Sequence, residues 1–374
     1  MTVRCYLILC LLLHANVLDA DDADTRQAVE DAKIVQTLLR LKGIDVNATP
    51  RLKSAVLRHL ETCLGTERYV DLAERLGVKG IEETLVQLAL RDSAGTAGVK
   101  AATLLLKRNE ERRFSRKLLS GTDQQAAVRA AEVLGFVGND QSFELLGPCV
   151  TSASSRAVQV AAASALGRNR KGQEFLLGLV QEGSLPRRLN FAVANALHAS
   201  PDPRIRREIA KHLQLPTAVN SKPLPPVATL VGKTGDVQRG RQLFQTTATC
   251  IKCHRVNGQG KEVGPDLSEI GSKLTREGFF VSILDPSAGI SHNFETYVAV
   301  LNNGNIATGV LINRTAGSIT LRTAEAIDKE IAADDVDELV KSDVSLMPAD
   351  IQKLLAVQDL VDVVEYLTTL KKRK

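Results

Sequence analysis

Small and aliphatic residues alternate at helical spacing along the N-terminal half of the chain, and the pattern recurs. Each recurring block is rich in alanine and leucine, and a second apolar stretch follows it, as at residues 143–150 and 174–180. Short runs of Gly, Asn and Asp separate these stretches. Four blocks begin at Val99, Val128, Val160 and Phe191, so their starts lie 29, 32 and 31 residues apart. Helical spacing with this period predicts helix–turn–helix repeats.

The repeats cover residues 24–215 and resemble a short HEAT-like α-solenoid, in which alanine lets neighbouring helices approach closely. A plain helical bundle is the alternative, and the regular period favours the solenoid. Each solenoid repeat contacts only its neighbours, so the product is an extended surface. The histidines of this region are isolated, and we expect surface or packing roles for His59, His198 and His212.

A proline-rich segment follows the repeats. Residues 216–233 hold four prolines, at positions 216, 223, 225 and 226. Proline lacks the backbone donor and fixes φ, so a helix cannot continue through this segment. We therefore expect a linker here and a second domain over residues 234–374.

The second domain begins and ends with predicted helices. Asp236 stands at the start of the first helix, where Gly240 and Phe244 lie one turn apart on one face. An amphipathic stretch at residues 359–367 closes the domain, and we expect Tyr366 to pack against the first helix.

Strand-like alternation of apolar and polar residues appears between these two helices. Asn-Gly turns interrupt it, and the pattern predicts a small antiparallel β-sheet inserted near residues 295–331. The expected fold class is therefore mainly α: a HEAT-like α-solenoid, then a helical domain that carries a β insertion.

The first twenty residues have the pattern of a targeting segment. Arg4 gives a positive start, residues 5–13 are apolar, and Ala20 ends a small-residue cleavage site. The apolar run is too short to span a membrane, and acidic residues follow it. We expect residues 1–20 to be a cleaved signal peptide. The mature chain would then be soluble, without a membrane span, and periplasmic or otherwise exported.

Composition bears on the class of partner. The chain is 44% hydrophobic and 24% charged, with a net charge of +5, 3% aromatic residues and no Trp. A nucleic-acid surface would interleave basic stripes with aromatic residues, and this chain does not. We expect no nucleic-acid binding.

Four of the six cysteines lie beyond the signal segment, too few for a disulfide scaffold in a chain this long. Cys63 and Cys149 stand in apolar helical contexts and are interpreted as buried small hydrophobic residues. The sequence does not decide whether they pair.

The other two cysteines form the motif Cys250-Ile251-Lys252-Cys253-His254. Two thiols at this spacing can each bond one vinyl group of a haem, and the adjacent histidine then faces the iron. A thioredoxin-type dithiol would require a βαβ setting, and a zinc site would require a second ligand pair. An inert pair of cysteines is the third alternative. We favour haem attachment over all three.

Methionine adds to this interpretation. The chain has two methionines, Met1 and Met347, and Met347 precedes the C-terminal helix. There it is placed to be the sixth ligand of haem iron opposite His254, although methionine is ordinarily a core residue. His292 is the second candidate for the sixth ligand.

The second domain resembles the haem-binding cytochrome c domain typical of planctomycete and verrucomicrobial proteins. The resemblance covers roughly the last 140 residues and rests on motifs in the family's order. These are the Gly235 helix, the Cys250–His254 motif, Gly264-Pro265-Asp266-Leu267, Ile283-Leu284-Asp285-Pro286-Ser287, Ser345-Leu346-Met347-Pro348 and Tyr366.

The resemblance implies a class I-like cytochrome c fold with Cys250 and Cys253 in thioether bonds and His254 and Met347 as axial ligands. It also implies that the Pro265 carbonyl accepts the ring N–H of His254 and fixes its tautomer. The β insertion would shield the haem or form a docking surface. In the family, repeats or dehydrogenase modules often precede the haem domain, and no dehydrogenase module is present here.

We expect an electron carrier with one covalently attached haem c, since the sequence has one such motif. Its redox partner would be a periplasmic dehydrogenase or another cytochrome, docked on the repeats. A haem enzyme of peroxidase or sulfur-compound oxidoreductase type, a dehydrogenase-complex subunit, and a structural repeat protein are the alternatives. Met347 discriminates the carrier from the haem enzyme, because a filled sixth position leaves iron no open site, and absence of haem would indicate the structural repeat protein.

Overall fold

The computed structural model describes residues 25–41, 43–114, 123–151 and 155–372. The predicted signal peptide lies outside the described residues. The chain divides into two compact units, residues 1–145 and 146–374. Each unit is described by itself.

The first unit is helical throughout its described residues. The alanines of the repeat pattern face inward: Ala101, Ala102, Ala130 and Ala131 are fully buried. Its helices are residues 25–40, the 3-10 helix η1 (Val46–Ala48), α2 (Pro50–Glu61), α3 (Glu67–Arg75), α4 (Glu82–Arg91), α5 (Thr96–Lys107), residues 111–114, α7 (Gln124–Val137) and the start of α8 (Asp140–Thr151).

The second unit begins with the end of α8 and four more helices of the same pattern. Ala162 and Ala163 of the third repeat block are fully buried, like their counterparts in the first unit. The helices are α9 (Arg156–Leu166), α10 (Arg170–Gln181), α11 (Asn190–His198) and α12 (Pro203–Ile209). All four sequence blocks therefore fall on helices, as predicted.

The proline-rich segment packs into the C-terminal domain. It contains a short helix, α13 (Val227–Val231). Leu224, Val227 and Leu230 belong to the same hydrophobic core as Phe244. The prolines interrupt regular structure, but the apolar residues between them enter this core. The segment is thus a structural part of the domain as well as a connection.

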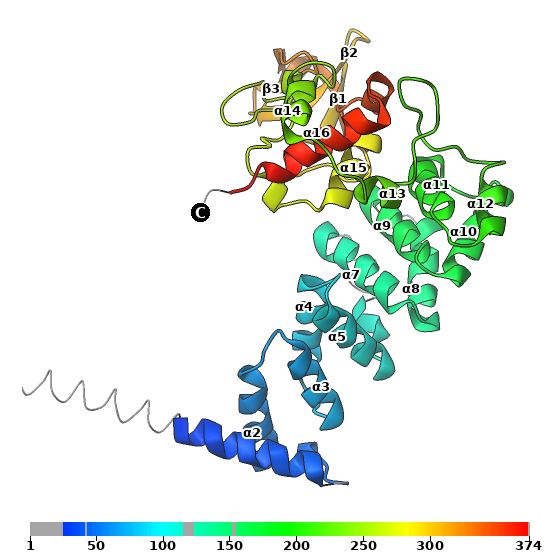
Figure 1. Cartoon of the computed structure of the whole chain (residues 1–374). Helices are drawn as coiled ribbons and strands as arrows, with labels where there is room; N and C mark the ends of the chain where they lie inside the picture. The colour runs from blue at the N-terminus through cyan, green and yellow to red at the C-terminus, as the bar shows by residue number, and fades with distance from the viewer. Residues whose placement is uncertain (1–24, 42, 115–122, 152–154, 373–374) are drawn as a thin grey trace, which may run out of the picture. The chain divides into compact units, whose positions relative to one another are not determined.

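Helices α14 (Val237–Gln245) and α16 (Val357–Thr369) pack together at the centre of the C-terminal domain (Figure 1). A Cβ at Gly240 would lie 1.9 Å from the carbonyl oxygen of Asp362, so only glycine allows this approach. The rings of Phe244 and Tyr366 meet edge to face with centroids 5.7 Å apart. The predicted packing of these two helices is confirmed.

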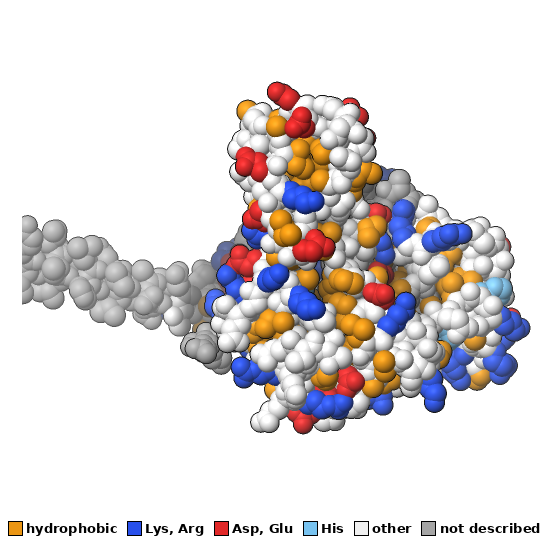
Figure 2. All heavy atoms as spheres, turned by 90° about the horizontal axis from the view of Figure 1, so that it is seen from above, with side chains coloured by type: hydrophobic (Ala, Val, Ile, Leu, Met, Phe, Trp, Pro, Cys, Tyr) orange, Lys and Arg blue, Asp and Glu red, His pale blue; other side chains and the backbone are white. Residues whose placement is uncertain are grey.

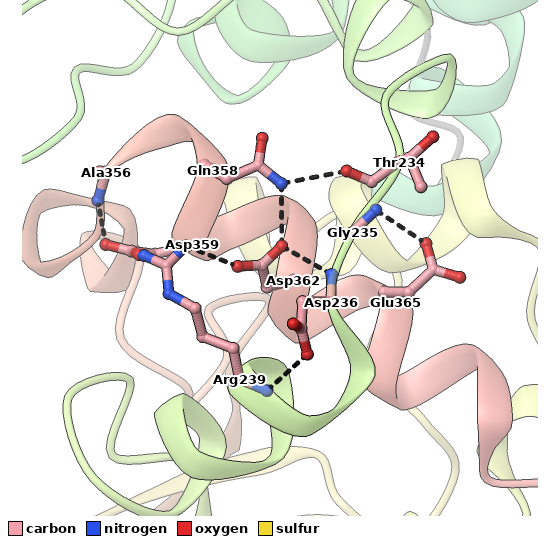
Figure 3. Close-up of polar contacts among 9 residues, drawn as sticks. All are labelled: Thr234, Gly235, Asp236, Arg239, Ala356, Gln358, Asp359, Asp362 and Glu365. Carbon is pink, nitrogen blue, oxygen red and sulfur yellow. Dashed lines mark hydrogen bonds and ion pairs between the residues drawn. The ribbon is translucent and has the colours of Figure 1, made fainter.

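A polar network fixes the start of α14 to α16 (Figure 3). The buried carboxylate of Asp362 accepts the Asp236 N–H at 2.9 Å, Arg239 Nη1 at 2.9 Å and Gln358 Nε2 at 2.8 Å. Arg239 also pairs with Asp359. Asp236 caps α14 by accepting the N–H of Arg239, as its position in the sequence predicts.

A five-stranded antiparallel sheet stands between α15 (Arg276–Leu284) and α16 in sequence, with strand order β4-β3-β2-β1-β5. Its strands are β1 (Thr296–Leu301), β2 (Ile306–Arg314), β3 (Ser318–Arg322), β4 (Asp328–Ala332) and β5 (Val336–Lys341). The predicted β insertion is confirmed, but it extends past residue 331. The fifth strand escaped prediction because its sequence, Val-Asp-Glu-Leu-Val-Lys, lacks strict alternation.

Within the described residues, no helix combines the length and the apolar character that crossing a membrane requires.

We expect Gly240→Ala to lower the free energy of unfolding by about 1–3 kcal/mol, because the new methyl group has no room against α16. Urea unfolding followed by circular dichroism measures the change. The matched control is Gly178→Ala in α10, where an added Cβ meets no atom within 4 Å. Equal midpoints for the two variants would contradict the close crossing.

Candidate functional site

The C-terminal domain contains a large cavity that is partly open to solvent and spans about 1070 Å³ when the space at its open side is included. Residues from α14, α15, the sheet and the loops between them form its wall. The lining is mainly apolar and includes Phe244, Val263, Leu267, Phe279, Ile283, Phe294 and Leu346. Such a wall suits a large, mostly apolar ligand.

The cysteine motif lies on one wall of this cavity. It follows α14 directly and begins with a 3-10 turn, Cys250–Lys252. Thr249 before the turn has a left-handed φ of 56°. The backbone N–H groups of Cys253 and His254 both donate to the Cys250 carbonyl, at 3.1 and 2.9 Å. This tight turn brings Cys250, Cys253 and His254 to the same cavity.

The ring of His254 has a fixed orientation. Its Nδ1 lies 2.8 Å from the Pro265 carbonyl oxygen, which can only accept, so Nδ1 carries the proton. The lone pair is then on Nε2, the atom that is left to bind a metal. Gly264 packs on the ring, since a Cβ there would lie 2.5 Å from His254 Cε1. The contact expected from the resemblance is therefore present.

Burial governs the protonation of the motif. It lowers the pKa of His254, an effect that the hydrogen bond to Pro265 partly opposes, and so favours the neutral imidazole that metal binding requires. Burial raises the pKa of the Cys250 thiol to about 12 and also raises the pKa of Cys253. A reactive dithiol requires the opposite shift. The dithiol alternative also lacks its βαβ setting, because the described strands all pair antiparallel.

Met347 lines the same cavity as the cysteine motif, together with its neighbours Ser345 and Leu346. Its N–H donates to Ser345 Oγ at 3.1 Å. The rival ligand His292 does not line the cavity. Its side chain is 88% exposed and lies beside Glu295. The structure thus brings four of the sequence's candidate residues and Pro265 together, and leaves His292 outside.

The β insertion contributes to the cavity wall through Val310 of β2. Side chains at the β3–β4 end hold the loop after the motif: Arg322 Nη1 donates to the Glu262 carbonyl at 3.1 Å. Lys261 Nζ in turn donates to the Glu325 carbonyl at 3.2 Å. The sheet therefore covers part of the cavity.

A zinc site finds no support among the residues that the structure describes, where no three His, Cys, Asp or Glu side chains are grouped to hold a metal ion. The donors that do share the cavity are two thiols, an imidazole nitrogen and a thioether sulfur. This donor set fits a covalently attached haem with two axial ligands. Cys250 and Cys253 would carry the thioether bonds, and His254 and Met347 would be the axial ligands.

The contacts of several cavity residues were missed by sequence reasoning. Gly264 stands in the motif Gly264-Pro265-Asp266-Leu267, but its packing on the ring of His254 was not predicted. Phe294 and Val310 could not, because their approach to the cavity depends on how the sheet packs on the helices. Ser345 stands in the motif Ser345-Leu346-Met347-Pro348, but its hydrogen bond to Ser287 depends on the fold and no local pattern reveals it.

Comparison with known proteins agrees with this geometry. No curated protein matches the chain. The family model described as cytochrome c matches residues 237–298. The match includes the cysteine motif and Pro265 and ends within β1, before Met347. Residues 237–298 thus support a c-type cytochrome haem-binding domain in the C-terminal part of this chain.

Proposed function

We propose that the chain is an exported electron carrier that holds one haem c, with Cys250 and Cys253 in thioether bonds and His254 and Met347 as axial ligands. The observation that carries the proposal is that one apolar cavity collects all four side chains. We further propose that the haem domain is of the planctomycete and verrucomicrobial type and that the repeats are HEAT-like. We also propose that a signal peptide directs the chain to the periplasm.

Each residue has a physical task in this account. Bound haem c supplies a one-electron couple of its iron. The Pro265 carbonyl holds the proton on Nδ1 of His254 and so keeps Nε2 available. The soft thioether of Met347 favours the reduced metal and raises the reduction potential. Phe244, Phe279 and the sheet residue Val310 exclude water from the cavity. Exclusion of water limits the reorganisation that accompanies a change of charge.

Haem attachment is tested by expression with cytochrome c maturation machinery, followed by the pyridine haemochrome spectrum. We expect one haem per chain and a c-type spectrum for the wild-type protein. Replacing both motif cysteines, Cys250→Ala with Cys253→Ala, should abolish covalent haem. The matched control, Cys149→Ala, removes a buried thiol outside the cavity and should retain it. Absence of haem from the wild-type protein would contradict the proposal and would favour a structural repeat protein with an inert cysteine motif.

Met347 separates the carrier from a haem enzyme. In the proposed carrier Met347→Ala opens the sixth position, so the far-red absorption band of methionine-ligated ferric haem should vanish. The variant should also bind carbon monoxide in the reduced state, which the wild-type protein should not. His292→Ala is the control and should leave both properties unchanged. Wild-type protein that already binds carbon monoxide would favour the enzymatic alternative.

We propose that the repeats dock an acidic redox partner. Figure 2 shows Lys and Arg side chains gathered along its right-hand edge, the edge at which Figure 1 places α12. Around this helix, residues 203–211 contain four basic residues and one acidic residue. Arg204, Arg207 and Lys211 are exposed. A concentration of one charge steers partners of the opposite charge.

The docking proposal predicts that Arg204→Glu with Arg207→Glu slows haem reduction by an acidic protein donor, with reduced ferredoxin as the probe. We expect a loss of about tenfold or more at low salt, in the range that steering provides, and a smaller loss at high salt. Reduction by dithionite should not change. Equal rates of reduction by ferredoxin for the variant and the wild-type protein would show that α12 is not part of the docking surface.

A further inference from the structure

A buried ion pair joins the repeats to the C-terminal domain within the second unit. Arg156, the first residue of α9, donates from Nη2 to Asp285 Oδ1 at 2.9 Å, and the two side chains are only 17% and 9% exposed. Two contacts from α11 support this junction. Asn195 Oδ1 accepts the Val227 N–H at 2.8 Å, and Phe191 packs on the core around the cavity.

The two partners of this pair depend on each other. The remaining polar atoms Arg156 Nε and Asp285 Oδ2 are buried and have no hydrogen-bond partner. Burial alone raises the pKa of Asp285, and Arg156 opposes that shift. A buried pair of this kind adds little net stability, but the loss of one member leaves an uncompensated buried group. The main effect of this ion pair is that it fixes the position of the Asp285 side chain.

Asp285 begins a tight turn at the cavity wall. It directly follows α15, and its carbonyl accepts the N–H of Ala288 at 2.9 Å. The two residues inside the turn have separate contacts. Pro286 lines the cavity. Ser287 Oγ accepts the backbone N–H of Ser345 at 3.0 Å. The turn that Asp285 begins is therefore hydrogen-bonded to Ser345 through Ser287.

Ser345 connects this turn to Met347. Its own Oγ accepts the Met347 N–H at 3.1 Å, and both residues line the cavity. Hydrogen bonds and the short turn at residues 285–288 thus connect a repeat helix to the Met347 backbone. We call it the positioning path, and its members are Arg156, Asp285, Ser287, Ser345 and Met347.

We propose that Arg156 is a positioning residue for Met347, so that the repeats set how firmly Met347 binds the haem iron. The inference rests on the proposed function, because it requires Met347 as a ligand. Loss of a path member would leave the cavity and the two motif cysteines that would hold the haem in place, but would loosen the segment that carries Met347. The repeats then tune the reduction potential and the accessibility of the iron as well as docking a partner.

The test uses imidazole, which competes with Met347 for ferric haem, on the full chain. Ser287→Ala and Arg156→Gln should each bind imidazole about threefold to tenfold more tightly than the wild-type protein, within the range of coupling through such networks. Both should also weaken the far-red band. Ser287→Ala keeps the ion pair intact and so remains informative where Arg156→Gln fails to fold. Arg170→Gln on α10, whose side chain is 76% exposed, is the matched control and should match the wild-type affinity.

A double variant distinguishes positioning from general loosening. In a Met347→Ala background, Arg156→Gln should leave imidazole affinity unchanged, because the path has lost its end point. An equal effect of Arg156→Gln in both backgrounds would overturn the proposal. The proposal would also be overturned if Ser287→Ala and Arg156→Gln both bound imidazole with wild-type affinity while Met347→Ala bound it more tightly. That result would leave methionine ligation intact. Unchanged affinity in Met347→Ala would overturn methionine ligation itself and this inference with it.

Discussion

The approach of α14 to α16 at Gly240 is the constraint on which the C-terminal domain depends. The motif turn follows α14 directly, and Leu367 of α16 contributes to the cavity wall, so the separation of the two helices determines the size of the cavity. A glycine at the crossing allows backbone contact, and the buried carboxylate of Asp362 fixes the register of the two helices. Specific polar contacts thus orient a domain whose core is otherwise apolar.

A second constraint acts on the ligands. An axial imidazole must present one nitrogen and keep the proton on the other, which the Pro265 carbonyl and the close packing of Gly264 provide. On the methionine side, backbone and serine contacts give the loop its position. The two candidate axial ligands are therefore held by different means. A short local loop fixes the histidine, and a path that begins in the repeats fixes the methionine.

Prediction from sequence succeeded where the signal is local. The helices of the repeat blocks, the capped helix at Asp236 and the alternation of the first four strands all depend on neighbouring residues. It failed where partners are distant. Strand β5 has a charged, irregular sequence and becomes a strand through pairing with β1. The wall residue Val310 and the pair of Arg156 with Asp285 join segments far apart in the chain.

The central claim, axial ligation by His254 and Met347, has a direct spectroscopic test. Met347 is the only methionine of the chain besides Met1, so a ligated methionine can be assigned without a mutant. The proton NMR spectrum of the reduced protein should contain one three-proton resonance far upfield of all others. It arises from a methyl group held against the face of the haem ring. A reduced, haem-containing protein without that resonance would contradict the account.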